Sequence, residues 1–176
     1  MTSASGAPVA IGFGNPLLGD DGVGLSVIDE LRRLSARDPG SLPPDTRLVT
    51  AGAPSTDLLP VLRDASVLLL IDAVDDGRPP GSIAVMRDAQ VDATVGRGEI
   101  SELLVAMRLT GHAPEAVALV GIQVSTMAPG VGLSTPVEGA VVEAARVACR
   151  ELAILDARPS DPRMRSISRH AREVYA

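Results

Sequence analysis

Two adjacent aspartates, Asp20 and Asp21, lie in a glycine-rich stretch near the start of the chain, which reads Gly12-Phe13-Gly14-Asn15-Pro16-Leu17-Leu18-Gly19-Asp20-Asp21-Gly22-Val23-Gly24. A short apolar run, residues 9–13, leads into this stretch. Apolar residues at the spacing of a buried helix face follow it: Val23, Val27, Ile28, Leu31 and Leu34. The segment therefore predicts a strand, a turn and a helix. Because the loops that leave the carboxyl ends of strands bind ligands in α/β proteins, the two carboxylates predict a cation site.

Two other interpretations of this stretch stay open. Gly12-Phe13-Gly14 begins like the Gly-x-Gly-x-x-Gly loop that binds dinucleotides, but Leu17 stands where the third glycine belongs. Asp20 and Asp21 would also place negative charge at the helix N-terminus that a pyrophosphate needs, so a nucleotide-dependent enzyme is disfavoured. One of the two aspartates can instead cap the helix, which leaves the other to be explained.

A third carboxylate, Asp72, ends the unbroken apolar run Val67-Leu68-Leu69-Leu70-Ile71. Such a run is typical of a central strand that is covered on both faces. If this strand is parallel to the 9–13 strand and next to it, Asp72 emerges at the same sheet edge as Asp21, and the two can pair across a cleft. Two carboxylates with an imidazole suit a first-row divalent metal. The alternative is that Asp72 only caps the strand end or hydrogen-bonds a loop.

Composition narrows the class of protein. The chain has 176 residues, which indicates one domain, and its net charge of −6 argues against a nucleic-acid binder. Phe13 and Tyr175 are the only aromatic residues, so platforms on which bases could stack are missing from the sequence. The single cysteine, Cys149, lies among small apolar residues, where we expect a buried side chain, and fits a reducing compartment. Neither a signal peptide nor a membrane-spanning run is evident, so we expect a cytoplasmic protein.

Strand-like and helix-like segments alternate along the rest of the chain. We expect strands over 46–50, 66–73, 82–86 and 116–122, and helices over 55–64, 99–109 and 135–155. Thr135-Pro136-Val137-Glu138 predicts a capping box at the start of the last helix. The pattern predicts a single α/β domain over 1–156, with an open, twisted, largely parallel sheet of about five strands and helices on both faces. Arginines among serines and prolines predict a basic, flexible tail over 157–176.

Several motifs, taken in order, resemble those of the nickel-iron hydrogenase maturation endopeptidases. They are the stretch from Gly12 to Gly24, Leu69 to Ala73, Pro80-Gly81-Ser82, Leu109-Thr110-Gly111, Leu119-Val120-Gly121 and Gly132 to Glu138. The resemblance spans about residues 9–155. It implies an aspartic-type endopeptidase that removes a C-terminal peptide from a hydrogenase large-subunit precursor once nickel has been inserted. Asp21 and Asp72 match two of the positions at which the family contacts the metal, and we assign both as catalytic and metal-binding.

The third family position, a histidine, has no counterpart in this sequence. It should lie just before the helix that begins near Glu99, but Val95-Gly96-Arg97-Gly98 contains no histidine. His112 lies beyond that helix, and His170 lies in the tail. Glu99, Gln90 or a group of the substrate could replace the imidazole.

The sequence therefore supports two hypotheses from different classes. The first is a processing endopeptidase whose nickel is supplied by the precursor and which holds no tightly bound organic cofactor. Its partner is the large-subunit precursor, with no nucleic acid and no membrane involved. The second, motivated by the missing histidine, is a non-catalytic module that binds the large subunit or its nickel site. Neither a Ser-His-Asp nor a Cys-His arrangement is evident, so cleavage would use a carboxylate as general base on water or polarisation by the nickel.

Overall fold

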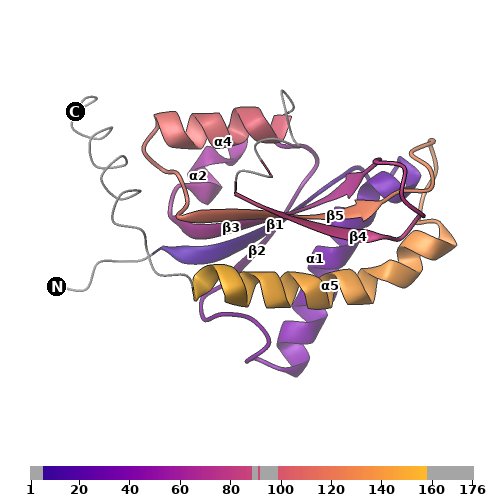
Figure 1. Cartoon of the computed structure of the whole chain (residues 1–176), viewed down its shortest axis with the longest axis horizontal. Helices are drawn as coiled ribbons and strands as arrows, with labels where there is room; N and C mark the ends of the chain where they lie inside the picture. The colour runs from indigo at the N-terminus through magenta and orange to yellow at the C-terminus, as the bar shows by residue number, and fades with distance from the viewer. Residues whose placement is uncertain (1–5, 89–90, 92–98, 158–176) are drawn as a thin grey trace.

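Five strands form one sheet in the order β2-β1-β3-β5-β4 in the computed structural model, which describes residues 6–88, 91 and 99–157 (Figure 1). Their bounds are β1 Ala7–Phe13, β2 Arg47–Ala51, β3 Ala65–Val74, β4 Ile83–Arg87 and β5 Ala116–Gln123. Strands β2, β1, β3 and β5 are mutually parallel, and β4 is antiparallel to β5. The predicted single-domain α/β fold with a largely parallel sheet is confirmed.

Helices cover both faces of this sheet. Helices α1 (Val23–Arg37) and α5 (Thr135–Asp156) lie on one face, and α2 (Leu59–Leu62) and α4 (Glu99–Leu109) lie on the other (Figure 1). Two short 3-10 turns, η1 (Gly19–Gly22) and η2 (Thr56–Leu58), precede α1 and α2. The connections thus place a loop or turn at the carboxyl end of each parallel strand.

Strand β3 supplies both halves of the aliphatic core. Its odd-numbered residues Val67, Leu69 and Ile71 pack on the α1 and α5 side, whereas Leu68 and Leu70 pack on the α2 and α4 side. All five are at most 4% exposed, as expected for a strand buried on both faces. The unbroken apolar run of the sequence therefore identified the centre of the sheet.

Two local predictions were wrong. The helix expected over 55–64 is limited to η2 and the four residues of α2, with Pro60 in the first turn of α2, and β3 begins soon afterwards at Ala65. The capping box expected at Thr135 does not form, because the N-cap residue of α5 is Ser134 and its side chain does not cap the helix. Its hydroxyl donates to the carboxylate of Asp20 instead, at 2.8 Å.

The predicted basic tail lies almost wholly in 158–176, outside the described residues. Within the part of the chain that the structure describes, no helix is both long and apolar enough to span a bilayer.

Candidate carboxylate site

Asp21 and Asp72 come from two neighbouring parallel strands. Strand β1 pairs with β3 in parallel, with Gly12 opposite Ile71, so both strands end at the same edge of the sheet. Asp21 lies in η1, in the connection that leaves β1, and Asp72 lies near the end of β3. The predicted neighbourhood of the two strands is therefore confirmed, and it brings both carboxylates to the carboxyl edge.

Glycines allow the first loop and α1 to pack directly against this edge. A Cβ atom on Gly24 would lie 2.3 Å from the carbonyl oxygen of Phe13 and 2.6 Å from that of Ile71. A Cβ atom on Gly12 would lie 2.2 Å from the carbonyl oxygen of Gly24. Side chains at these positions would push α1 away from β1 and β3. The glycine spacing of the first loop thus serves close backbone packing, and this packing fixes where Asp21 lies.

The two adjacent aspartates of this loop have different surroundings. Asp20 is 0% exposed, and its carboxylate accepts hydrogen bonds from the backbone N–H groups of Ser125, Thr126 and Ser134 and from the Ser134 hydroxyl. Burial raises the pKa of Asp20, but these hydrogen bonds outweigh burial and leave the pKa below its ordinary value. Asp20 is a structural clamp between the first loop and the β5–α5 loop.

Asp21 is only partly buried, and the Asn15 N–H donates to its Oδ2 at 2.7 Å. Neither aspartate caps a helix, because the N-cap residues of η1 and α1 are Leu18 and Gly22 and neither cap has a side-chain hydrogen bond. The capping interpretation is therefore wrong for both residues. Asp21 keeps oxygen lone pairs that can bind a cation.

Asp72 is a half-buried carboxylate with a strongly shifted pKa. Because side chains alternate along a strand, Asp72 faces the same side as Leu68 and Leu70, toward α4. Its pKa is raised to about 6, mainly by burial, and the negative charges of Asp21 and Glu99 add to this rise. The Ala73 N–H donates to Oδ1 at 2.8 Å and opposes the rise. Asp72 therefore interacts electrostatically with Asp21 and with Glu99, and a divalent cation would relieve this repulsion.

The position of the missing histidine falls where the structure gives no description. Gln90, residues 95–98 and His170 lie outside the described residues. His112 is a loop residue beyond the C-terminal end of α4, and the 11 residues of that helix separate its ends by about 16 Å. Among the described residues, Glu99 is the candidate replacement whose charge reaches Asp72. No group of three or more His, Cys, Asp and Glu side chains in the described ranges is arranged to hold a metal ion.

A buried glutamine that the sequence did not single out orders the turn next to Asp72. Gln123, at the end of β5, is 3% exposed. Its Nε2 donates to Asp75 Oδ1 at 3.0 Å, and its Oε1 accepts from the Asp76 N–H at 2.9 Å. The sequence could have indicated this role, because a polar residue at the end of a buried strand must find hydrogen-bond partners.

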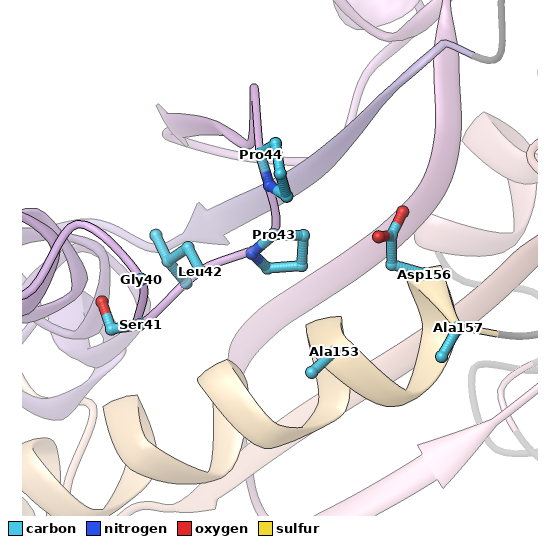
Figure 2. A pocket seen from close by; sticks show the side chains of 8 residues that line it. All are labelled: Gly40, Ser41, Leu42, Pro43, Pro44, Ala153, Asp156 and Ala157. Atoms are coloured by element: carbon cyan, nitrogen blue, oxygen red, sulfur yellow. The ribbon is translucent and has the colours of Figure 1, made fainter.

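A hollow of about 310 Å³ lies at the other end of the molecule (Figure 2). The loop over 40–44 and the last turn of α5 line it, and Asp156 is the one charged residue among its lining residues. Because α5 starts beyond the carboxyl end of β5 and runs for 22 residues, this hollow is about 33 Å along the helix from Thr135. It is therefore separate from the carboxylate site.

Comparison with known proteins gives one consistent family. A family model described as hydrogenase maturation protease matches residues 26–151, a range that contains Asp72 and begins shortly after Asp21. The chain is 32% identical over 152 residues to the hydrogenase expression/formation protein HupD of Rhodobacter capsulatus, covering 82% of this chain and 70% of the relative. It is 26% identical over 140 residues to the hydrogenase 2 maturation protease of Escherichia coli, covering 76% of this chain and 82% of that protein.

The fold agrees with this result. The hydrogenase maturating endopeptidase HybD from Escherichia coli superposes with a TM-score of 0.71 at 25% sequence identity, covering 82% of this chain and 93% of that structure.

Proposed function

This chain belongs to the hydrogenase maturation protease family, and on that premise we propose that it is an endopeptidase that removes the C-terminal peptide of a nickel-iron hydrogenase large-subunit precursor after nickel insertion. The observation that carries the proposal is the convergence of Asp21 and Asp72 at the carboxyl edge of the sheet. Their charges interact, so each is close enough to influence a cation bound by the other.

Nickel is part of the substrate in this proposal. Asp21 and Asp72 contact the nickel that the precursor carries, and Glu99 adds a third negative charge to the same site. Carboxylate oxygens are weaker ligands for nickel than imidazole nitrogens, so the chain recognises a metal that is already held by the precursor. No tightly bound organic cofactor is required.

Asp72 is the better candidate for the proton acceptor in cleavage. With a pKa of about 6 it is ionised at neutral pH and is still a stronger base than an ordinary carboxylate. Asp72 would take a proton from the attacking water while the water oxygen adds to the peptide carbonyl carbon. The C–N bond then breaks, and the proton passes to the leaving amine. Polarisation of that carbonyl by the precursor's nickel is the second route.

The test is to mix the purified protein with nickel-loaded and nickel-free precursor and to follow the released peptide by mass spectrometry. We expect release from the nickel-loaded precursor only. Binding of the precursor without release would favour the alternative, a non-catalytic module that recognises the large subunit. Absence of both binding and release would contradict the proposed function.

A further inference from the structure

The first loop and the β5–α5 loop form one hydrogen-bonded unit at the carboxyl edge of the sheet. The Gly19 N–H donates to the Gly130 carbonyl at 2.9 Å, and the Gly130 N–H donates to the Leu17 carbonyl at 2.9 Å. The Asp20 N–H also donates to the Thr126 carbonyl at 3.1 Å, and the buried Asp20 carboxylate accepts a hydrogen bond from the Thr126 N–H of the β5–α5 loop. In Figure 1 the orange loop between β5 and α5 accordingly lies beside the turn that follows β1. The backbone of this surface is therefore fixed.

Apolar side chains project from this fixed backbone into solvent. Leu17 is 63% exposed, Met127 is 46% exposed and Val131 is 87% exposed. Residues 14–19 and 125–134 contain no charged side chain. We call Leu17, Met127 and Val131 the apolar platform. These side chains lie on two loops that are hydrogen-bonded to each other, so together they can form part of a surface that contacts another molecule.

The first loop carries both Leu17 of the apolar platform and Asp21 of the carboxylate site. The Leu17 N–H donates to Asn15 Oδ1 at 3.0 Å, and the Asn15 N–H donates to Asp21 Oδ2 at 2.7 Å. Asn15 thus connects the backbone of one platform residue to the carboxylate that we assign to the nickel. A molecule that presents a cation to Asp21 therefore approaches the same loop that carries Leu17.

We propose that the apolar platform docks the uncharged, aliphatic polypeptide that flanks the nickel site of the precursor. This inference rests on the proposed function and names the surface that recognises the same substrate. The charges support this occupant, because the carboxylates of Asp21 and Asp72 at one sheet edge complement a divalent cation, and residues 14–19 and 125–134 carry no charge that would need a partner. A stable interface takes about 20 to 30 residues from each partner, so the three side chains of the platform form a subsite within a larger contact.

The experiment measures the affinity of Leu17→Ser, Met127→Ser and Val131→Ser for nickel-loaded precursor by titration calorimetry. Full burial of one such side chain in an interface raises the affinity about tenfold or more. We therefore expect Leu17→Ser and Val131→Ser each to weaken binding about tenfold. Processing should show a raised KM with an unchanged kcat. The matched control is Leu109→Ser, which removes a side chain that is 68% exposed at the far end of α4, and which should bind as the parent does. Melting curves confirm that each variant is folded.

The outcomes separate this inference from the proposed function. If the parent cleaves the precursor and the platform variants bind it as tightly as the parent, the platform is wrong and the peptidase stands. If the parent binds without cleaving and the variants bind more weakly, the platform stands and the peptidase is wrong. A parent that binds no precursor contradicts both. A parent that sedimentation shows to be a dimer, and that becomes a monomer on Val131→Ser, would assign the platform to a second copy and overturn the inference.

Discussion

Two neighbouring aspartates, Asp20 and Asp21, have different surroundings in this molecule. Asp20 is fully buried and accepts hydrogen bonds from three backbone N–H groups and a hydroxyl, whereas Asp21 is partly exposed and accepts a hydrogen bond from the Asn15 N–H. A carboxylate whose oxygens are all engaged by donors has little capacity left for a metal. The structure therefore indicates a stabilising role for Asp20, and Asp21 is the aspartate that we propose to contact the nickel.

Substitution by asparagine separates these roles. In Asp20→Asn the amide NH₂ faces groups that are themselves donors, so we expect the free energy of unfolding at pH 7 to fall by about 2 to 4 kcal/mol. Asp21→Asn keeps an oxygen for the Asn15 N–H and should change stability by less than about 1 kcal/mol. Because the pKa of Asp20 is below its ordinary value, the stability that its ionised carboxylate provides is lost as the pH falls through that lowered pKa. The difference in free energy of unfolding between the parent and Asp20→Asn should therefore shrink at acid pH. Urea unfolding at pH 7 and at acid pH checks both statements; equal losses for the two variants would contradict them.

Asp72 makes the native state less stable as its carboxyl group ionises. Its pKa rises from 3.8 to about 6 on folding, so between these values the native state binds more protons than the unfolded state, and stability falls as the pH rises. Asp72→Asn keeps an acceptor for the Ala73 N–H and removes the charge. We expect it to raise the free energy of unfolding at pH 7.5 by about 1 to 2 kcal/mol, with no gain at pH 4. Melting temperatures of both proteins at both pH values test this; a destabilised Asp72→Asn at pH 7.5 would show that the carboxylate is a structural group.

The close packing of α1 against β1 and β3 depends on single glycines. Gly24→Ala places a methyl group within 2.6 Å of two backbone carbonyls, so α1 must shift away from β1 and β3. We expect a loss of about 3 kcal/mol or more, together with loss of precursor processing, because α1 begins directly after Asp21. The control is Gly139→Ala in α5, where a Cβ atom meets nothing within 4 Å and where alanine should stabilise the helix by about 0.5 to 1 kcal/mol. Thermal unfolding of the pair gives the comparison, and shifts of the same sign would contradict it.

Most elements could be predicted from periodicity because each carries its own pattern. The five apolar residues before Asp72 identified β3, and helical spacing identified α1 and α4. The capping box failed for a non-local reason, since the Ser134 hydroxyl is bound to Asp20, 114 positions away in the sequence. Local sequence patterns contain no information on such a partner. For the same reason the sequence could not predict that Asp20 and Asp21 differ in their hydrogen bonds, because donors to Asp20 come from the β5–α5 loop.

The two ends of the sheet differ in the residues that lie there. The carboxyl edge combines Asp21, Asp72 and Glu99 with the apolar platform, whereas the hollow at the other end is lined by the 40–44 loop and the end of α5 (Figure 2). Parallel strand pairing explains why residues so far apart in sequence meet at one edge. The sequence predicted this convergence once β1 and β3 were assumed to be neighbours. The apolar platform was not predicted, because exposure of Leu17 and Val131 depends on how two loops pair.

The roles of the Asp21 and Asp72 carboxylates are tested by comparing nickel-dependent processing by the parent, Asp21→Asn, Asp72→Asn and Asp29→Asn. Asp29 is an exposed carboxylate on α1 that pairs with Arg32, so its substitution controls for the loss of one negative charge. We expect the parent and Asp29→Asn to release the C-terminal peptide from nickel-loaded precursor at similar rates. Asp21→Asn and Asp72→Asn, although folded, should release it at least about 100-fold more slowly. Release at the parental rate by either of these two variants would contradict the assignment of that carboxylate to the nickel site.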